Sequence, residues 1–125
     1  MDVKVVTLPT EKITDWNTFH SVCKDVFGFP DFYGRNMNAW IACMYSINSP
    51  EDGMTKVHVS VGGILVIKVD RADDFKKRCP EQHDALVECT AFVNYGRSRG
   101  HELNPHIEKE EPMLALMLIG HYLHA

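Results

Sequence analysis

Residues 64–70 read Ile-Leu-Val-Ile-Lys-Val-Asp, and this run constrains the fold more than any other stretch of the chain. In an extended strand, its first four residues place apolar side chains on both faces. Such a run is typical of the central strand of a covered parallel sheet. We therefore predict that residues 64–69 form a central strand, with other strands and helices packed around it.

Two other segments can supply neighbouring strands. Residues 3–8, Val-Lys-Val-Val-Thr-Leu, are rich in β-branched side chains and stop at Pro9, which cannot continue a hydrogen-bonded ladder. Residues 113–119, Met-Leu-Ala-Leu-Met-Leu-Ile, are apolar throughout, and we interpret them as the last buried strand. A helix is the competing interpretation there, because only Ile119 is β-branched.

Residues 57–61, Val-His-Val-Ser-Val, alternate between apolar and polar side chains, which indicates a half-buried strand. Gly62 and Gly63 follow directly and can adopt the positive φ angles of a two-residue turn. We expect an extra hairpin strand at this point in the chain.

Helices are predicted between the strands. Thr14 offers an N-cap oxygen ahead of an apolar stripe that ends at Phe27, and Gly28 suits the left-handed position after a helix. Asn36 offers a second N-cap, ahead of apolar residues at helical spacing. Two further helices are predicted, a short one over residues 73–78 and a longer one that begins at Pro80 and ends between residues 96 and 100.

This order of elements predicts an α/β domain with a small, mainly parallel sheet packed with helices. A chain of 125 residues with 45% hydrophobic content can bury one core, so residues 1–125 are expected to form a single domain. No apolar run reaches the roughly 18 to 20 residues that a membrane span needs, and the start of the chain lacks a secretion signal. We expect a cytoplasmic protein with no membrane partner.

Charge and cysteine usage narrow the classes of function. A formal net charge of -4 argues against direct nucleic-acid binding, which needs a basic surface. The four cysteines form no C-x-x-C pair, so we interpret them as reduced thiols that are mostly buried.

Metal and cofactor sites are not predicted, although the chain holds seven histidines. Cys79 and His83 are four residues apart at a predicted helix start, but no further ligands follow at usable spacing. Pro105 would break the helix that a zinc motif between His101 and His106 requires.

Catalysis has weak support in the sequence. The chain contains neither a nucleophile elbow nor a glycine-rich phosphate loop. Asp70, Asp73 and Asp74 leave open a small hydrolase, although acids at a solvated helix start explain them better. That hydrolase would need a cleft that joins these acids to a histidine.

Residues 36–50 contain no Asp, Glu, Lys or Arg, although half of the helix predicted there should face outward. Either the chain's own residues 57–63 or 101–112 cover that side, or it is an interface for a partner protein. In the interface interpretation Tyr33 and Tyr45 serve as anchors, with Tyr33 the aromatic side chain of the preceding loop that we expect to be partly exposed.

Residues 29–40, Phe-Pro-Asp-Phe-Tyr-Gly-Arg-Asn-Met-Asn-Ala-Trp, followed by Cys43, resemble the loop and second helix of the barstar family of intracellular inhibitors of the ribonuclease barnase. The order of the predicted elements agrees with this resemblance over most of the chain. The resemblance implies a three-stranded parallel sheet and an inhibitor without catalysis of its own. It also implies that the loop and second helix block the nuclease active site, where acidic side chains imitate phosphate.

Several positions differ from that family pattern. Asn38 and Ala42 stand where the family has aspartates, and Ile41 replaces an interfacial tryptophan. Phe32 replaces a tyrosine, and Asn94 or a neighbour stands where a fourth-helix glutamate would be. Because a neutral surface complements a basic cleft less well, we expect a nuclease or toxin other than barnase as the partner.

The leading hypothesis is an immunity-type inhibitor that binds a ribonuclease or related toxin. Its predicted contact residues are Tyr33, Arg35, Asn36, Asn38, Ile41, Ala42 and Tyr45. The alternative on the same fold is a protein-interaction module that does not inhibit a toxin and binds through residues 101–112. This polar segment is longer than the resemblance implies, and we predict that it is an exposed loop.

Overall fold

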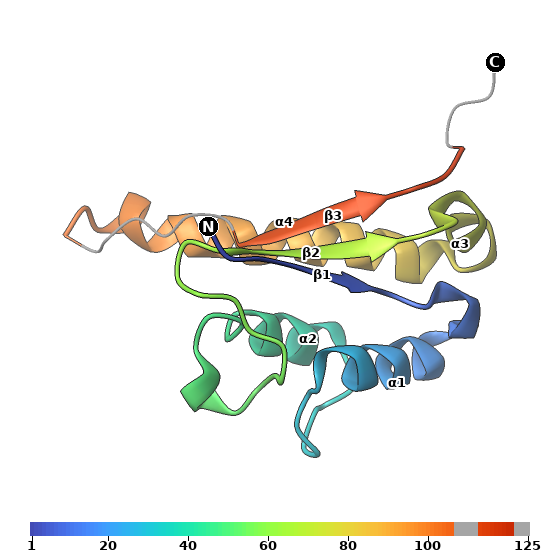
Figure 1. The fold of residues 1–125 in the computed structure, drawn as a ribbon, viewed down its shortest axis with the longest axis horizontal. Coiled ribbons are helices and arrows are strands. Elements are labelled where there is room, and N and C mark those ends of the chain that lie inside the picture. Colours follow the sequence, from blue (N-terminus) through green and yellow to red (C-terminus); the bar gives the residue numbers. More distant parts are fainter. Residues whose placement is uncertain (107–112, 122–125) are drawn as a thin grey trace.

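The structure is a computed structural model that describes residues 1–106 and 113–121. Two helices lie between each pair of successive strands, in the predicted order except for the strand expected over residues 57–61 (Figure 1). The elements are β1 (Val3–Thr7), α1 (Trp16–Phe27), α2 (Met37–Met44), β2 (Ile64–Val69), α3 (Ala72–Arg78), α4 (Pro80–Leu103) and β3 (Leu114–Leu118), with short 3-10 turns at Thr10–Lys12 and Pro50–Asp52.

The three strands form one sheet in the order β1-β2-β3, and both pairings are parallel. In the register, Val66 of β2 lies between Val5 of β1 and Ala115 of β3. The α/β class, the parallel sheet and the central position of residues 64–69 are therefore confirmed. Residues 114–118 are a strand, so the competing helix interpretation of the last apolar run is wrong.

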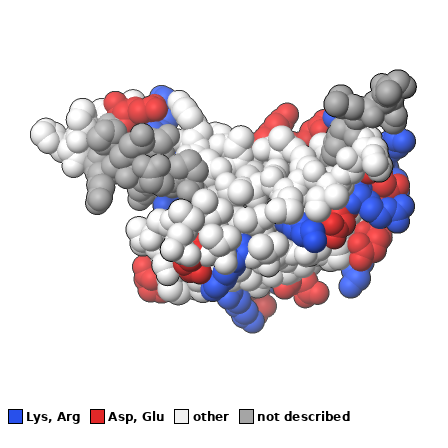
Figure 2. Space-filling model, turned by 45° about the horizontal axis from the view of Figure 1, so that its top comes forward, with Lys and Arg blue, Asp and Glu red and all other residues white. Residues whose placement is uncertain are grey.

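The two faces of the sheet differ in cover. Leu65, Ile67 and Val69 are fully buried beneath the helices, with α1 and α2 below the sheet and α4 behind it in Figure 1. On the opposite face Val66 is only half-buried and Val5 is 57% exposed. Figure 2 shows a broad area with few charged side chains in the middle of the molecule. The expectation that β2 is covered on both faces is thus wrong for one of them.

Connection geometry explains the one-sided cover. The strands are added in one direction across the sheet, from β1 to β2 to β3. Right-handed connections between parallel strands that advance in one direction place their helices on the same face. Both crossovers of this chain follow that rule, so no helix is left for the other face within the described residues.

Residues 57–61 do not form the predicted hairpin strand. Both edges of β2 are already paired, with β1 and with β3. Val59 is buried instead near the end of α2, where its N–H donates to the Ile47 carbonyl at 3.1 Å. Gly63 is needed for a different reason than a hairpin, because a Cβ there would lie 2.6 Å from the Asp2 carbonyl oxygen.

The helix ends agree with the predictions in part. Gly28 ends α1 with φ 68°, as expected, but Asp15 rather than Thr14 is the N-cap. Asp15 and Thr18 form a reciprocal capping box, with Asp15 Oδ1 accepting from the Thr18 N–H at 2.8 Å. Asp15 lies nearest the helix start, and its carboxylate is a better acceptor than the Thr14 hydroxyl.

Helix α4 begins at Pro80, as predicted, but it continues to Leu103 rather than ending between residues 96 and 100. Gly96 lies inside the helix, where a Cβ would overlap the Tyr45 hydroxyl. The glycine permits close packing of α4 against the end of α2 and does not end the helix. The predicted loop over residues 101–112 therefore starts later, and residues 107–112 lie outside the described residues.

Candidate protein interface

The loop between α1 and α2 is built on two buried aromatic rings. Phe29 packs against Phe27 and against Tyr33, with ring centroids 5.6 and 4.7 Å apart. The Tyr33 N–H donates to the Pro30 carbonyl at 2.9 Å and closes a tight turn. At the tip of this turn Phe32 points outward and is 75% exposed.

Tyr33 is buried, with 6% of its surface exposed, so the prediction of partial exposure is wrong. Its hydroxyl lies 2.5 Å from Nδ1 of His20 and forms a hydrogen bond there. Because this buried partner satisfies the hydroxyl, the ring can remain inside the core. Burial raises the pKa of Tyr33, which keeps the hydroxyl protonated.

Arg35 has a left-handed backbone, with φ 54°, and an exposed side chain. Its Nη2 donates to the Asn17 carbonyl at 2.7 Å, to Asn17 Oδ1 at 2.7 Å and to Ser21 Oγ at 2.9 Å. These contacts hold the guanidinium against the outer side of α1.

Asn36 is the N-cap of α2, as predicted. Its Oδ1 accepts from the Ala39 N–H at 2.8 Å, and its Nδ2 donates to the Gly34 carbonyl at 3.3 Å. Both ends of the amide are thus used to fix the turn into the helix.

Helix α2 buries Trp40, Cys43 and Met44 and turns its other side outward. Asn38 and Ala42, four residues apart on one helix face, are exposed. Ile41 beside them is half-buried. Within the described residues nothing covers Asn38 and Ala42, and residues 57–61 reach only the far end of the helix.

The structure thus divides the predicted contact residues into two groups. Tyr33 and Tyr45 turn inward, Tyr33 toward His20 and Tyr45 toward Gly96 of α4. The others are exposed, except for the half-buried Ile41, and the exposed Phe32 has to be added to them. We define the recognition surface as Phe32, Arg35, Asn36, Asn38, Ile41 and Ala42.

Sequence reasoning omitted Phe32 from this set. The adjacent pair Phe32 and Tyr33 was a usable signal, because one of the two rings faces the core and the other faces solvent. The buried hydroxyl partner that selects Tyr33 over Phe32 for the inward position comes from His20, 13 residues away. That pairing is visible only in three dimensions.

A shallow hollow of about 290 Å³ adjoins the recognition surface and is lined by Trp16, His20, Arg35, Asn36 and Met37. The ring of Trp16 stacks on that of His20 with centroids 5.9 Å apart and planes 20° from parallel. His20 is buried, and burial lowers its pKa, with the nearby Arg35 acting in the same direction. A neutral imidazole is therefore favoured at the base of the hollow.

Asn94 does not face the recognition surface, although the resemblance placed an interfacial glutamate near it. Its Oδ1 accepts from the backbone N–H groups of Met113 and Leu114 at 3.2 and 3.1 Å. Its Nδ2 donates to the Leu114 carbonyl at 2.9 Å. Asn94 thus joins α4 to the start of β3.

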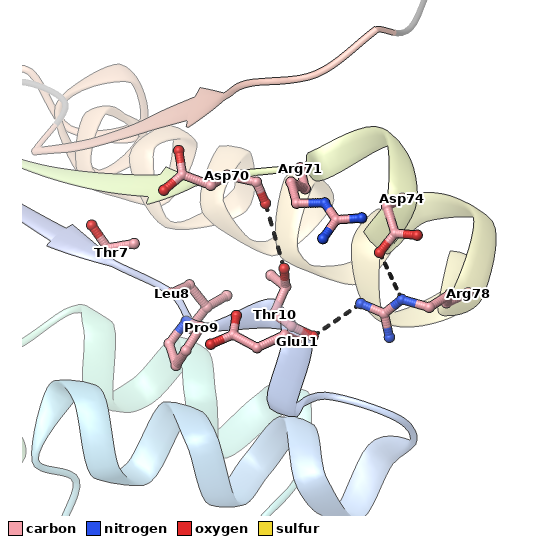
Figure 3. Close-up of a pocket in the computed structure, with 9 residues that line it drawn as sticks. All are labelled: Thr7, Leu8, Pro9, Thr10, Glu11, Asp70, Arg71, Asp74 and Arg78. Atoms are coloured by element: carbon pink, nitrogen blue, oxygen red, sulfur yellow. Dashed lines mark hydrogen bonds and ion pairs between the residues drawn. The ribbon is translucent and has the colours of Figure 1, made fainter.

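A second cavity, of about 210 Å³, opens at the carboxyl ends of β1 and β2 and contains Asp70 and Asp74 (Figure 3). Arg78 donates from Nε to Asp74 Oδ2 at 2.8 Å and from Nη2 to the Thr10 carbonyl at 3.0 Å. No histidine lines this cavity among the described residues, and Asp73 is not part of its wall. Within the described residues, this cavity therefore does not join Asp70 and Asp74 to a histidine, as the hydrolase would require.

Residues 1–106 and 113–121 also bear on metal binding, membrane insertion and thiol chemistry. In this part of the chain no three His, Cys, Asp or Glu side chains gather closely enough to hold a metal ion. Every helix among these residues is too short or too polar to span a bilayer. All four cysteines are free thiols, and burial raises the pKa of Cys23 to about 12.

Comparison with known proteins agrees with this geometry. The family model described as Barstar (barnase inhibitor) matches residues 3–107. That range includes the loop, α2 and all of α4. No curated protein gives a significant match to the chain.

Proposed function

This chain belongs to the barstar family, and from that premise we propose that it is an intracellular inhibitor that binds a ribonuclease or related toxin and blocks its active site. The family is described by an inhibitory activity and not by a catalytic one. The proposal assigns binding to the recognition surface defined above.

The observation that carries the proposal is the outward side of α2. Asn38 and Ala42 are exposed on a helix that contains no charged residue, and the Asn36 cap fixes where that helix starts. Solvated helix faces are normally charged, so an uncharged face beside an exposed Phe32 fits burial by a partner. Phe32 is the large aromatic side chain there that can enter a partner pocket.

The same residues indicate what kind of nuclease the protein inhibits. An amide and a methyl group at positions 38 and 42 bring no negative charge to a basic cleft. Shape and desolvation rather than charge neutralisation must then supply most of the affinity. We infer that the target differs from barnase in the charge of the surface it offers.

A toxin-rescue assay tests the proposal. Candidate nuclease toxins encoded beside the gene are co-expressed with this chain, and survival of the cells is measured. Ala42→Arg places a long cation on the recognition surface and should abolish rescue. Ala91→Arg is the matched control, because Ala91 is an exposed alanine of α4 outside the recognition surface, and this variant should retain full rescue.

Thermal unfolding of both variants separates loss of binding from loss of folding. Rescue that survives Ala42→Arg would contradict the assignment of this surface. If binding to a partner is lost on deletion of residues 103–110 and retained in Asn38→Lys, the protein is an interaction module that binds through that segment.

A further inference from the structure

We propose that the hollow beside the recognition surface receives an acidic side chain of the partner protein, next to an apolar one, and that Arg35 binds the carboxylate. This inference rests on the proposed function, because it names the partner chemistry of the same interface. The hollow lies between the first turns of α1 and α2 and includes Arg35 and Asn36 of the recognition surface.

The walls of the hollow are mostly apolar, and the aromatic wall is fixed. Trp16 is 36% exposed, and its indole Nε1 donates to Glu81 Oε2 of α4 at 3.0 Å. The Trp16 ring is also stacked on His20, so the hydrogen bond holds the edge of the indole and the stacking holds its face. Met37 supplies a flexible thioether on another side. A rigid aromatic wall together with an adaptable thioether suits an aliphatic or aromatic side chain.

The rim of the hollow carries one oriented cation. Nη2 of Arg35 donates to the carbonyl and amide oxygens of Asn17 and to the Ser21 hydroxyl, which are all neutral acceptors. Among the described residues no acceptor is bound to Nε or Nη1. The guanidinium is thus held in place with its charge uncompensated and its other donors available.

A guanidinium fixed in this way is prepared for a carboxylate. The planar donors of arginine match the two oxygens of a carboxylate, and charge-assisted hydrogen bonds are stronger than neutral ones. Because the side chain is already ordered by Asn17 and Ser21, little rotamer entropy remains to be lost on binding.

Charge around the site favours one carboxylate over phosphate groups. Residues 36–50 bring no charge, and burial favours the neutral form of His20, so Arg35 is the cation that lines the hollow. The chain as a whole carries a formal charge of -4, which repels a polyanion such as RNA. An acidic side chain of a protein carries a single negative charge, which can pair with Arg35 without the repulsion that a polyanion meets.

Peptide titration of the full chain, followed by NMR, tests the inference. The probes are acetyl-Leu-Asp-amide and its neutral match acetyl-Leu-Asn-amide. The aspartyl peptide should shift the Trp16 indole N–H and Arg35 Nε–H signals and bind at least about fivefold more tightly than the asparaginyl peptide. That preference should shrink as salt is added to the wild-type protein.

Arg35→Gln should remove the preference for the aspartyl peptide. Arg71→Gln is the matched control, because Arg71 is also an exposed arginine with positive φ, at 51°, and lines the cavity at the other site. Its variant should keep the full preference. The salt dependence of the wild type decides the question even if Arg35→Gln fails to fold.

Equal binding of the two peptides, the absence of any shift at Trp16 and Arg35, or perturbation of these signals by a short RNA and not by the aspartyl peptide would overturn the inference. The titration uses no toxin, so its failure leaves the toxin-rescue result standing. In the same way, failure of rescue in the toxin assay leaves the peptide result intact.

Discussion

The two faces of the sheet carry similar side chains and meet different surroundings. On the covered face, Leu65 and Ile67 are fully buried under the helices. On the open face, Val5 of the edge strand is 57% exposed, and Val66 of the central strand is half-buried. Successive residues of one strand, Val66 and Ile67, therefore belong to two different environments.

This difference teaches that an apolar sequence run does not by itself require two helical layers. The direction in which strands are added, together with the right-handed connections, decides which face the helices cover. The side-chain pattern of β2 is compatible with cover on both faces, but the topology supplies one layer only. Variants on the two faces should therefore differ sharply in stability.

Truncation within β2 gives the largest expected contrast. Ile67→Ala removes a fully buried side chain and should lower the free energy of unfolding by about 2–5 kcal/mol. Val66→Ala, one residue away, should cost about 1 kcal/mol or less, because its side chain already meets solvent. Urea denaturation measures both, and equal losses would show that the open face is covered in solution.

Substitution of Asn94 tests how strongly α4 holds the edge strand β3. Asn94→Ala leaves the Met113 and Leu114 N–H groups and the Leu114 carbonyl without their side-chain partner, at a cost of about 1–3 kcal/mol. Amide hydrogen exchange of β3 should accelerate at the same time. Asn38→Ala removes an exposed asparagine from α2 and should leave both stability and exchange nearly unchanged.

On the helix-covered side of the sheet, His20 of α1 should destabilise the protein in mild acid. Burial lowers the pKa of His20 below its ordinary value of 6.5, so the unfolded chain takes up this proton first. Stability should therefore be constant above about pH 6.5 and fall as the pH drops toward the folded pKa. Denaturant unfolding across this range measures the loss, and His20→Gln should reduce the slope.

The stabilisation that the carboxylates contribute is lost in a separate, lower pH range. Backbone hydrogen bonds hold the pKa of Asp15 and of Asp2 below the ordinary 3.8. Their contribution is present above that value and is lost as the pH falls below it. A fall in stability between pH 6.5 and 5 that persists in His20→Gln would assign the acid sensitivity to another group.

The smallest effect is expected on the edge strand of the open face. Val5→Thr changes an exposed side chain and should alter the free energy of unfolding by about 0.5 kcal/mol or less. Val6→Thr is its match on the covered face, where Val6 is half-buried against the core, and should cost more. The reverse order in thermal unfolding would mean that the open face is the better protected one.

Local signals in the sequence predicted much of this fold. The apolar run of residues 64–69, the Asn36 cap and Gly28 each depend on a few neighbouring residues, and all three were predicted. Predictions failed where a distant partner decides the outcome. Residues 57–61 alternate like a strand, but β1 and β3 occupy both edges of β2, so neither edge is left for this segment.

The recognition surface shows the same limit. Asn38 and Ala42 face outward as helical spacing predicts, and their role in binding stays a prediction. The orientation of Tyr33 could not be derived, because it depends on His20 of another helix. Tyr45 was predicted as an anchor for the partner, but its hydroxyl packs against α4 of the chain itself.

The contact between Gly96 and Tyr45 has a consequence for how such an interface can change. Tyr45 is the C-cap residue of α2, and a methyl group at position 96 would overlap its hydroxyl. Relief of that overlap requires either the Tyr45 ring or the end of α2 that carries it to shift relative to α4. Under the proposed function, a substitution at position 96, which lies outside the recognition surface, would then change how Asn38 and Ala42 are presented to the partner, so variation at this position offers a route to new targets.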